Sequence, residues 1–245
     1  MKLTVVGYWH GFPESKEATS GYLLEADGFR LLLDCGSGVI SNLQRYTELN
    51  QLDAVVLSHY HHDHAADVKV LHYHRILRHY GEGQERPLTI YGHNEDRESF
   101  AALGYEGFVD HFPIDDTKPF TIGPFTFTFV KTDHPVPCYG MKVEHETGSF
   151  FYTADSSYIE KLAEAGQDVD LFICECSLYA GTDGSHIGHM NSTEAGKLAE
   201  KANANELLLT HLPHTGDHGQ LRTEAAEEFT GPVHVARRGW TRKWN

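Results

Sequence analysis

The segment of residues 58–64, Ser-His-Tyr-His-His-Asp-His, constrains this chain more than any other stretch. Four histidines and one aspartate fall within its last six residues, directly after the apolar run at residues 53–57. That run predicts a buried strand, and the end of a strand can hold ligands rigidly on a loop that stays open to substrate. Imidazole nitrogen and carboxylate oxygen suit zinc, and also iron or manganese. The segment therefore predicts a metal site, and the order of its residues disfavours the alternative, a surface histidine cluster without function.

Length and composition predict one folded domain. A chain of 245 residues is compatible with a single large α/β domain over residues 1–245. Hydrophobic residues make up 40% of the chain and aromatic residues 11%, which suffices for a core and is too much for a disordered chain. No repeat, low-complexity tract or linker interrupts the sequence, so we expect no further division.

The charge of the chain narrows the range of partners. A formal net charge of −15 disfavours a sequence-independent grip on nucleic-acid backbones. Divalent metal ions would add positive charge at one point, so a local anion site remains compatible with an acidic protein.

The N-terminal segment, the apolar runs and the cysteines predict a cytoplasmic protein without a membrane span. Residues 1–7 read as a short strand and lack the apolar core of a signal peptide, and no stretch approaches the roughly 18 apolar residues of a membrane span. Buried free thiols are the favoured role of the cysteines, because none of them forms a Cys-x-x-Cys pair. The four cysteines are Cys35, Cys138, Cys174 and Cys176.

Side chains that can carry chemistry recur where other predicted strands end. Residues 119–130 alternate as two strands, and residues 149–153, 170–175 and 206–210 are apolar runs of strand length. The four strand-end candidates are, in chain order, His134, Asp155, Glu175 and His211. Asp155 taken alone fits a helix cap equally well, so it is a candidate through its place in this series.

Capping residues and periodicity predict helices near residues 39–47, 65–80, 94–103 and 220–229, and one that ends near residue 202. Asn94 is the expected cap of the third, and Asn191, Ser192 or Thr193 caps the helix that ends near residue 202. The turn signal Asp27-Gly28 predicts a hairpin over residues 20–34.

The sequence leaves the roles of several histidines and one aspartate open. Asp34 fits a helix cap and a carboxylate that orients a ligating histidine equally well. His72, His74 and His79 lack the spacing of the metal motif, so packed or solvated side chains are expected there. Lining of the cleft by His93 is the minor alternative.

The motif His59-x-His61-x-Asp63-His64 matches the metallo-β-lactamase-fold hydrolases, and the whole chain resembles the RNase Z-like branch of that superfamily. The segments that carry the resemblance are residues 58–64, 133–140, 152–155, 174–176, 188–192 and 209–211. The resemblance implies an α/β fold, the αββα four-layer sandwich of two mixed β-sheets flanked by helices.

The resemblance also implies a metal-dependent hydrolase with two divalent ions, zinc by preference and manganese or iron as alternatives. A metal-bridging hydroxide would then be the nucleophile. Asp63 would also accept a proton from the attacking water, and His189, oriented by Glu175, would donate to a phosphoryl oxygen or leaving group. The implied metal ligands are His59, His61 and His134 at the first ion, Asp63, His64 and His211 at the second, and Asp155 bridging both.

Departures from the RNase Z pattern disfavour tRNA 3′-processing. Only 20 residues separate His134 from Asp155, too few for the long arm with which those enzymes hold tRNA. The loop at residues 13–17 is acidic, as is the chain as a whole. A small phosphodiester or a cyclic nucleotide is therefore the expected substrate.

Other functions stay open at this stage. The same ligands serve lactone or carboxylic ester hydrolysis, for which Tyr158 is the candidate tyrosine by position alone. A metal-stabilised binding module is the non-enzymatic alternative, and β-lactam hydrolysis is disfavoured because Asp63 occupies the second site. The resemblance also suggests a homodimer, with Trp240 and Trp244 either in its contact or packed on the last strand.

Overall fold

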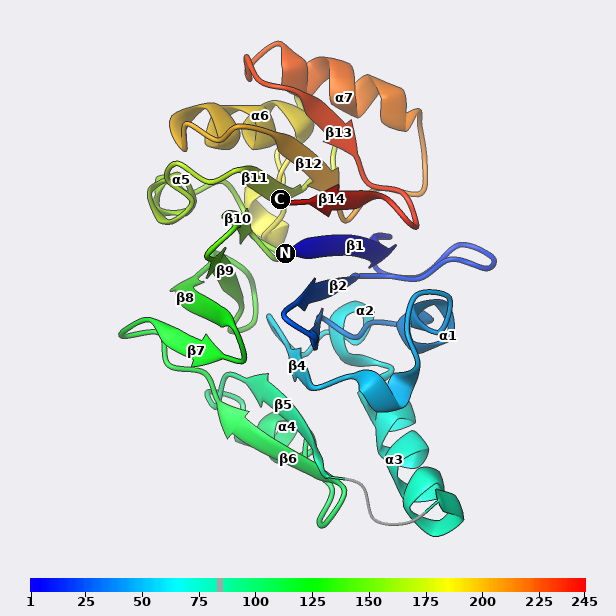
Figure 1. Cartoon of the computed structure of the whole chain (residues 1–245). Coiled ribbons are helices and arrows are strands. Elements are labelled where there is room, and N and C mark those ends of the chain that lie inside the picture. Colours follow the sequence, from blue (N-terminus) through cyan, green and yellow to red (C-terminus); the bar gives the residue numbers. More distant parts are fainter. Residues whose placement is uncertain (83–85) are drawn as a thin grey trace. The chain divides into compact units, whose positions relative to one another are not determined.

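The protein is described by a computed structural model that covers residues 1–82 and 86–245. The chain forms two compact units, coloured by sequence in Figure 1. The first unit contains residues 1–7, 11–114 and 238–243, and the second contains residues 8–10, 115–237 and 244–245. The single domain expected from the sequence stays a prediction.

The first unit is one sheet of seven strands in the order β14-β1-β2-β3-β4-β5-β6. Neighbours from β14 to β3 pair antiparallel, and neighbours from β3 to β6 pair parallel. Its strands are β1 Lys2–Gly7, β2 Gly21–Ala26, β3 Phe29–Leu33, β4 Ala54–Val56, β5 Leu88–Gly92, β6 Val109–Pro113 and β14 Thr241–Lys243. Its helices are α1 Val39–Leu43, the 3₁₀ turn η1 Leu49–Gln51, α2 His62–Ala65, α3 Val68–Glu82 and α4 Arg97–Ala101.

The second unit is also one sheet of seven strands, in the order β13-β12-β11-β10-β9-β8-β7. Neighbours from β7 to β10 pair antiparallel, and neighbours from β10 to β13 pair parallel. Its strands are β7 Phe120–Ile122, β8 Phe125–Lys131, β9 Tyr139–His145, β10 Gly148–Tyr152, β11 Leu171–Glu175, β12 Leu207–Thr210 and β13 Val233–Val235. Its helices are α5 Glu160–Ala165, the 3₁₀ turn η2 Ser185–Ile187, α6 Ser192–Lys201 and α7 His218–Ala226.

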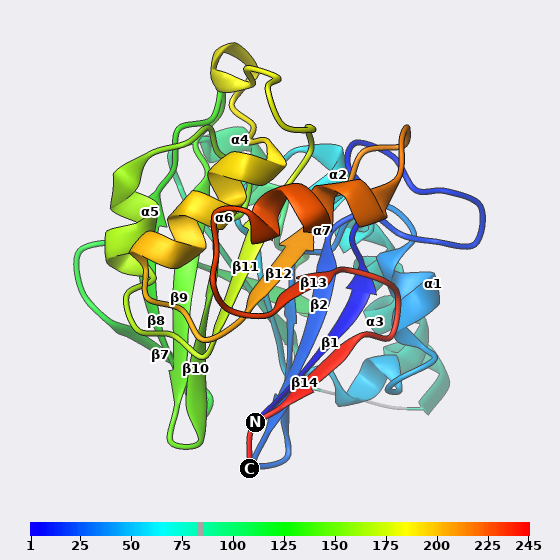
Figure 2. The same ribbon diagram turned by 90° about the horizontal axis from the view of Figure 1, so that it is seen from above.

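The two sheets therefore share one pairing scheme, three antiparallel pairs followed by three parallel ones. Parallel neighbours bring their carboxyl ends to one edge of the sheet, and ligand-bearing loops of α/β sheets gather there. In the second unit, α6 and α7 lie side by side along the strands β11 to β13, as both views show (Figures 1 and 2).

Burial in the first unit follows from the apolar runs in the sequence. Leu32 of β3 and Val55 of β4 are fully buried, as expected for parallel strands that are covered by helices. They belong to one apolar cluster with Val39 of α1 and Leu71 of α3. The runs that precede the site residues are thus core strands, which hold the strand ends in place.

Most of the predicted strands and the hairpin are confirmed, and several boundaries were wrong. The expected helix over residues 65–80 is α3, which begins only at Val68, because the chain turns at Asp67, whose N–H donates to Cys35 O at 3.0 Å; the short helix α2 before it had not been predicted. The helix expected over residues 39–47 is α1, which already ends at Leu43. The helix expected over residues 220–229 is α7, which spans His218–Ala226. Asn94 is not the cap of α4, because the Asp96 side chain accepts the Ser99 N–H at 3.1 Å. Strands β6 and β14 and helix α5 had not been predicted.

The cysteine prediction is confirmed, since all four thiols are free and buried. Burial raises the pKa of Cys35, Cys174 and Cys176 well above the usual value of a thiol, so these groups stay neutral and unreactive. Over the part of the chain that the structure describes, no helix has the length and apolarity to cross a membrane.

The hairpin turn gives a first prediction. Asp27 and Gly28 have φ of 51° and 79°, the left-handed pair that a two-residue turn requires. An added Cβ at Gly28 meets nothing within 4 Å, so Gly28→Ala should cost only backbone strain. We expect the free energy of unfolding to fall by about 1 kcal/mol, with the melting temperature about 2–4 °C lower by calorimetry.

Gly81→Ala is the matched control, because Gly81 lies in α3 with equally open space around it. It should leave the stability unchanged or raise it by up to about 1 kcal/mol. Equal melting temperatures for the two variants would contradict the assigned strain.

Candidate metal centre

The loop after β4 packs against the loop after β3. The N–H of Cys35 donates to His64 O at 2.7 Å, and Gly36 lies against the backbone of Asp63. A Cβ at Gly36 would stand 2.0 Å from the Asp63 carbonyl oxygen and 2.2 Å from Thr19 Oγ1, so only glycine fits there. The Asp-x-Gly sequence at residues 34–36 is therefore a support for the metal motif.

Asp34 is the carboxylate that orients this loop, which decides between its two sequence-based assignments. It is fully buried and accepts the N–H and the hydroxyl of Ser58 at 2.8 and 2.9 Å. Nδ1 of His64 donates to Asp34 Oδ2 at 2.8 Å, and Nδ1 of His59 lies 3.0 Å from the Ser58 oxygen. Helix α1 instead starts after Gly38 without a side-chain cap.

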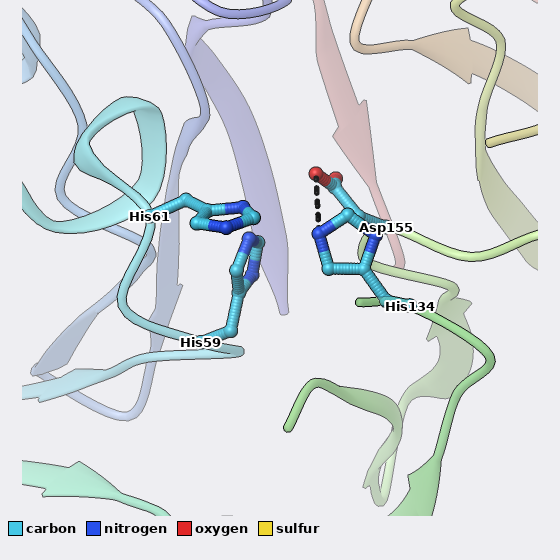
Figure 3. A group of neighbouring side chains, drawn as sticks. All are labelled: His59, His61, His134 and Asp155. Carbon is cyan, nitrogen blue, oxygen red and sulfur yellow. Dashed lines mark ion pairs between the residues drawn. The ribbon is translucent and has the colours of Figure 1, made fainter. Parts of the chain in front are cut away.

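These contacts determine which nitrogen of each histidine meets a metal. When Nδ1 donates to a carboxylate or hydroxyl, Nε2 is the basic nitrogen of the neutral ring. Nε2 of His64 lies 3.7 Å from Asp63 Oδ2, which also accepts the N–H of Gly11 at 2.9 Å. The same loop carries His59 and His61 (Figure 3), with potential ligand atoms within 4.8 Å of each other. Among the motif residues, His62 points to solvent.

The second unit brings His134, Asp155 and His211 together. Nε2 of His134 lies 4.0 Å from Asp155 Oδ2, the contact dashed in Figure 3, and Nε2 of His211 lies 3.6 Å from the same oxygen. Nδ1 of His134 donates to Gly188 O at 3.0 Å. Burial lowers the pKa of His134, so the ring is held neutral, which is the form that binds metals.

Glu175 is the orienting carboxylate of the second unit. It is fully buried and accepts five hydrogen bonds, from the N–H groups of Ser156, Ser177 and Met190, the Ser177 hydroxyl and His189 Nδ1. The His189 contact measures 2.9 Å, which agrees with the orientation of His189 by Glu175 that the resemblance implied. Ser177 Oγ lies 3.0 Å from His211 Nδ1. Glu175, His189 and His211 also lie close enough to hold an ion, but the hydrogen bonds at both Glu175 oxygens favour the orienting role.

Sharp backbone turns follow these strands. Asp34, Ala154 and His211 all have left-handed φ, at 56°, 53° and 55°. Such conformations cost a non-glycine residue about 1–3 kcal/mol and cluster at functional sites. In each case the turn redirects the chain directly at or before a candidate site residue.

The donor set of each unit fits divalent metal ions. Neutral imidazoles with Nδ1 held and Nε2 turned toward a carboxylate are the usual partners of zinc, iron and manganese. The two sets are His59, His61, Asp63 and His64 in the first unit, and His134, Asp155 and His211 in the second.

One site residue was missed by the sequence analysis. The ring of His10 lies 4.6 Å from that of His211 and 5.0 Å from that of His189, measured between centroids. No spacing or motif marks His10, because it follows β1 in the chain and meets His189 and His211, which are 179 and 201 positions away. The backbone pairing of Tyr8–His10 with the segment after β12 brings them together.

Residues with open assignments are packed elsewhere. His72 is buried and donates from Nε2 to Leu103 O at 2.8 Å, as expected for a packed histidine. His93 is buried against the Tyr60 ring at 4.3 Å. Tyr158 lies beneath the Lys201 ammonium at 5.8 Å. Trp244 packs against Phe150 of β10 and not on the last strand, as one alternative had it.

Comparison with known proteins identifies the class. A family model of the beta-lactamase superfamily domain matches residues 29–212. The chain belongs to this superfamily, has the metallo-β-lactamase fold and is a metal-dependent hydrolase.

Individual relatives agree with this class. The chain is 48% identical over 240 residues to the probable metallo-hydrolase YhfI of Bacillus subtilis, with 98% of each chain covered. The crystal structure of YhfI superposes with a TM-score of 0.95 at 46% identity, again over 98% of both chains. Ribonuclease Z of Myxococcus xanthus is 27% identical over 302 residues, covering 98% of this chain and 97% of the relative. The resemblance to the RNase Z-like branch is thus confirmed.

Asp34→Ala tests the orienting carboxylate. The change leaves the buried donors of Ser58 and His64 without their acceptor, so the free energy of unfolding should fall by about 3 kcal/mol. Loss of such a partner typically weakens metal binding about 10–100-fold. Urea unfolding and metal titration against a chromophoric chelator measure the two effects.

Asp116→Ala is the control, since Asp116 is exposed. Its stability should stay within about 0.5 kcal/mol of the wild type. Unchanged metal affinity in Asp34→Ala would contradict the orienting role.

Proposed function

We propose that this protein is a dinuclear metal-dependent phosphodiesterase that acts on a small phosphodiester or a cyclic nucleotide. The observation that carries the proposal is the pair of donor sets, each with imidazoles oriented by a buried carboxylate and serine. Together they would hold two divalent ions, zinc by preference, through His59, His61, Asp63, His64, His134, Asp155 and His211. When bound, the ions would supply Lewis acidity and activate a water molecule near neutral pH.

In the proposed reaction, two protein side chains accept and donate protons or hydrogen bonds. Asp63, whose carboxylate accepts the Gly11 N–H at 2.9 Å, would accept a proton from the attacking water. His189 would donate to a phosphoryl oxygen or leaving group. The hydrogen bond from Nδ1 to Glu175 sets its orientation and leaves the Nε2 edge turned away from Glu175.

The Glu175–His189 pair favours a phosphodiester over a lactone. A phosphoryl group develops charge on several oxygens, and a hydrogen-bond donor beside the metals stabilises that charge. The lactonase tyrosine has no counterpart in Tyr158, whose ring pairs with Lys201. Lactone or carboxylic ester hydrolysis remains the alternative function.

The size of the substrate follows from two features of the second unit. The chain between His134 and Asp155 is taken up by β9, the turn at residues 146–147 and β10, which leaves no segment for a tRNA-binding arm. A cavity of about 300 Å³ opens beside His134, lined also by Pro135 and His186, within the usual range for small-molecule sites.

A diphosphatase of the PhnP family has the same fold, with a TM-score of 0.77 at 17% identity over 100% of this chain and 98% of that chain. Cytoplasmic location and a homodimer remain predictions.

Metal content and hydrolysis test the proposal together. Wild type should contain two metal ions per chain and hydrolyse bis-p-nitrophenyl phosphate, whereas Asp63→Ala should lose at least one ion and most of this activity. His62→Ala is the matched control, because this exposed histidine of the same loop is outside the donor sets. Cleavage of a homoserine lactone without phosphodiester cleavage would favour the alternative, and one metal ion or none in the wild type would contradict the dinuclear site.

His189→Gln tests the proposed donor separately. With metal content unchanged, kcat for bis-p-nitrophenyl phosphate should fall by about 100-fold or more, the usual contribution of a positioned proton donor. Unchanged kcat in a variant with full metal content would show that His189 is only a packed histidine.

A further inference from the structure

The segment Tyr8–His10 is held firmly within the second unit. The N–H of His10 donates to Leu212 O at 3.2 Å, and the N–H of Leu212 donates to Tyr8 O at 3.0 Å. Nε2 of His214 donates to His10 O at 2.8 Å, and its ring stacks on Trp9 at 4.9 Å. Both backbone polar groups of His10 are therefore fixed, and so is the direction in which its side chain leaves the chain.

This side chain completes a group of three histidines. The ring centroids of His10, His189 and His211 lie 4.6, 5.0 and 5.4 Å apart. His211 and His189 are buried, with 1% and 9% of their surface exposed, whereas His10 is partly exposed. A ligand that reaches this group from solvent would thus meet His10 together with His189.

The two inner rings are oriented by their buried edges. Nδ1 of His189 is held by Glu175, and Nδ1 of His211 by Ser177. Their Nε2 edges are directed away from those partners, and the Nε2 of His211 faces Asp155 at 3.6 Å. His211 thus faces the candidate metal set, whereas His189 lies beside the partly exposed ring of His10.

We propose that His10 and His189 form a subsite for an anionic phosphoryl oxygen of the substrate, with His10 as a specificity-determining residue. The inference rests on the proposed phosphodiesterase function and names the part of the substrate that His10 recognises. A neutral imidazole carries one N–H in either tautomer, and donors fixed before binding stabilise an anion without reorganisation. The backbone contacts of His10 provide this fixed placement.

Equilibrium binding of inorganic phosphate to the metal-loaded protein tests the subsite without any turnover. His10→Phe keeps a ring that can pack on His189 and His211 but removes the N–H. By isothermal titration calorimetry, its dissociation constant for phosphate should rise about tenfold or more, with metal content unchanged. His10→Gln retains a donor and should recover part of the affinity.

His218→Phe is the matched control, because His218 contacts Trp9 of the same segment at 5.3 Å and lies outside the group of three histidines. Its affinity for phosphate should equal that of the wild type. Wild-type affinity in His10→Phe, or no phosphate binding by the metal-loaded wild type, would overturn the subsite. Equal losses in His10→Phe and His10→Gln together with reduced metal content would instead assign His10 a structural role and overturn it as well.

The two proposals fail separately. If the wild type hydrolyses no phosphodiester, the proposed function is wrong, whereas phosphate binding compared between wild type and His10→Phe still decides the subsite. If hydrolysis occurs and the two proteins bind phosphate equally, only the role of His10 is wrong.

Discussion

The hydrogen bonding of two buried carboxylates is the interaction on which the site depends. Asp34 and Glu175 are both fully buried, and a buried charge is tolerated only when donors surround it. Each uses a serine, Ser58 or Ser177, together with an imidazole Nδ1 for this purpose. The hydrogen bonds that stabilise the buried carboxylates therefore also orient the histidines. One set of contacts thus contributes both to the stability of the fold and to the geometry of the site.

The shared pairing scheme of the two sheets explains why these carboxylates stand in comparable places. Asp34 follows β3, the strand at which the first sheet changes from antiparallel to parallel pairing, and Glu175 ends β11, one strand beyond the same change in the second sheet. Parallel strands need long connections, and these loops carry the functional side chains at the carboxyl edge. The left-handed residues at these edges are the conformational cost of turning the chain there.

The proposed chemistry assigns different tasks to histidines of very similar surroundings. His211 and His189 both lie in the second unit with Nδ1 held, but only His211 faces the Asp155 carboxylate, at 3.6 Å. In the proposal, this difference separates the metal ligand His211 from the substrate donor His189. In its proposed role, His10 is oriented by the hydrogen bonds of its backbone N–H and C=O groups.

The sequence by itself determined the superfamily, most strands and the candidate ligands, because these depend on local apolar runs and on a motif within a few residues. It also placed Glu175 beside His189. It left Asp34 undecided, named Asn94 as a cap where the structure has Asp96, and missed β14 and His10. Apart from the helix cap, which is a local contact between Asp96 and Ser99, those features depend on partners far away in the chain: β14 pairs with β1, and His10 meets His189 and His211. Only the tertiary structure decided the role of Asp34, the pairing of β14 and the place of His10, because hydrogen bonds and ring contacts between distant segments leave no local pattern in the sequence.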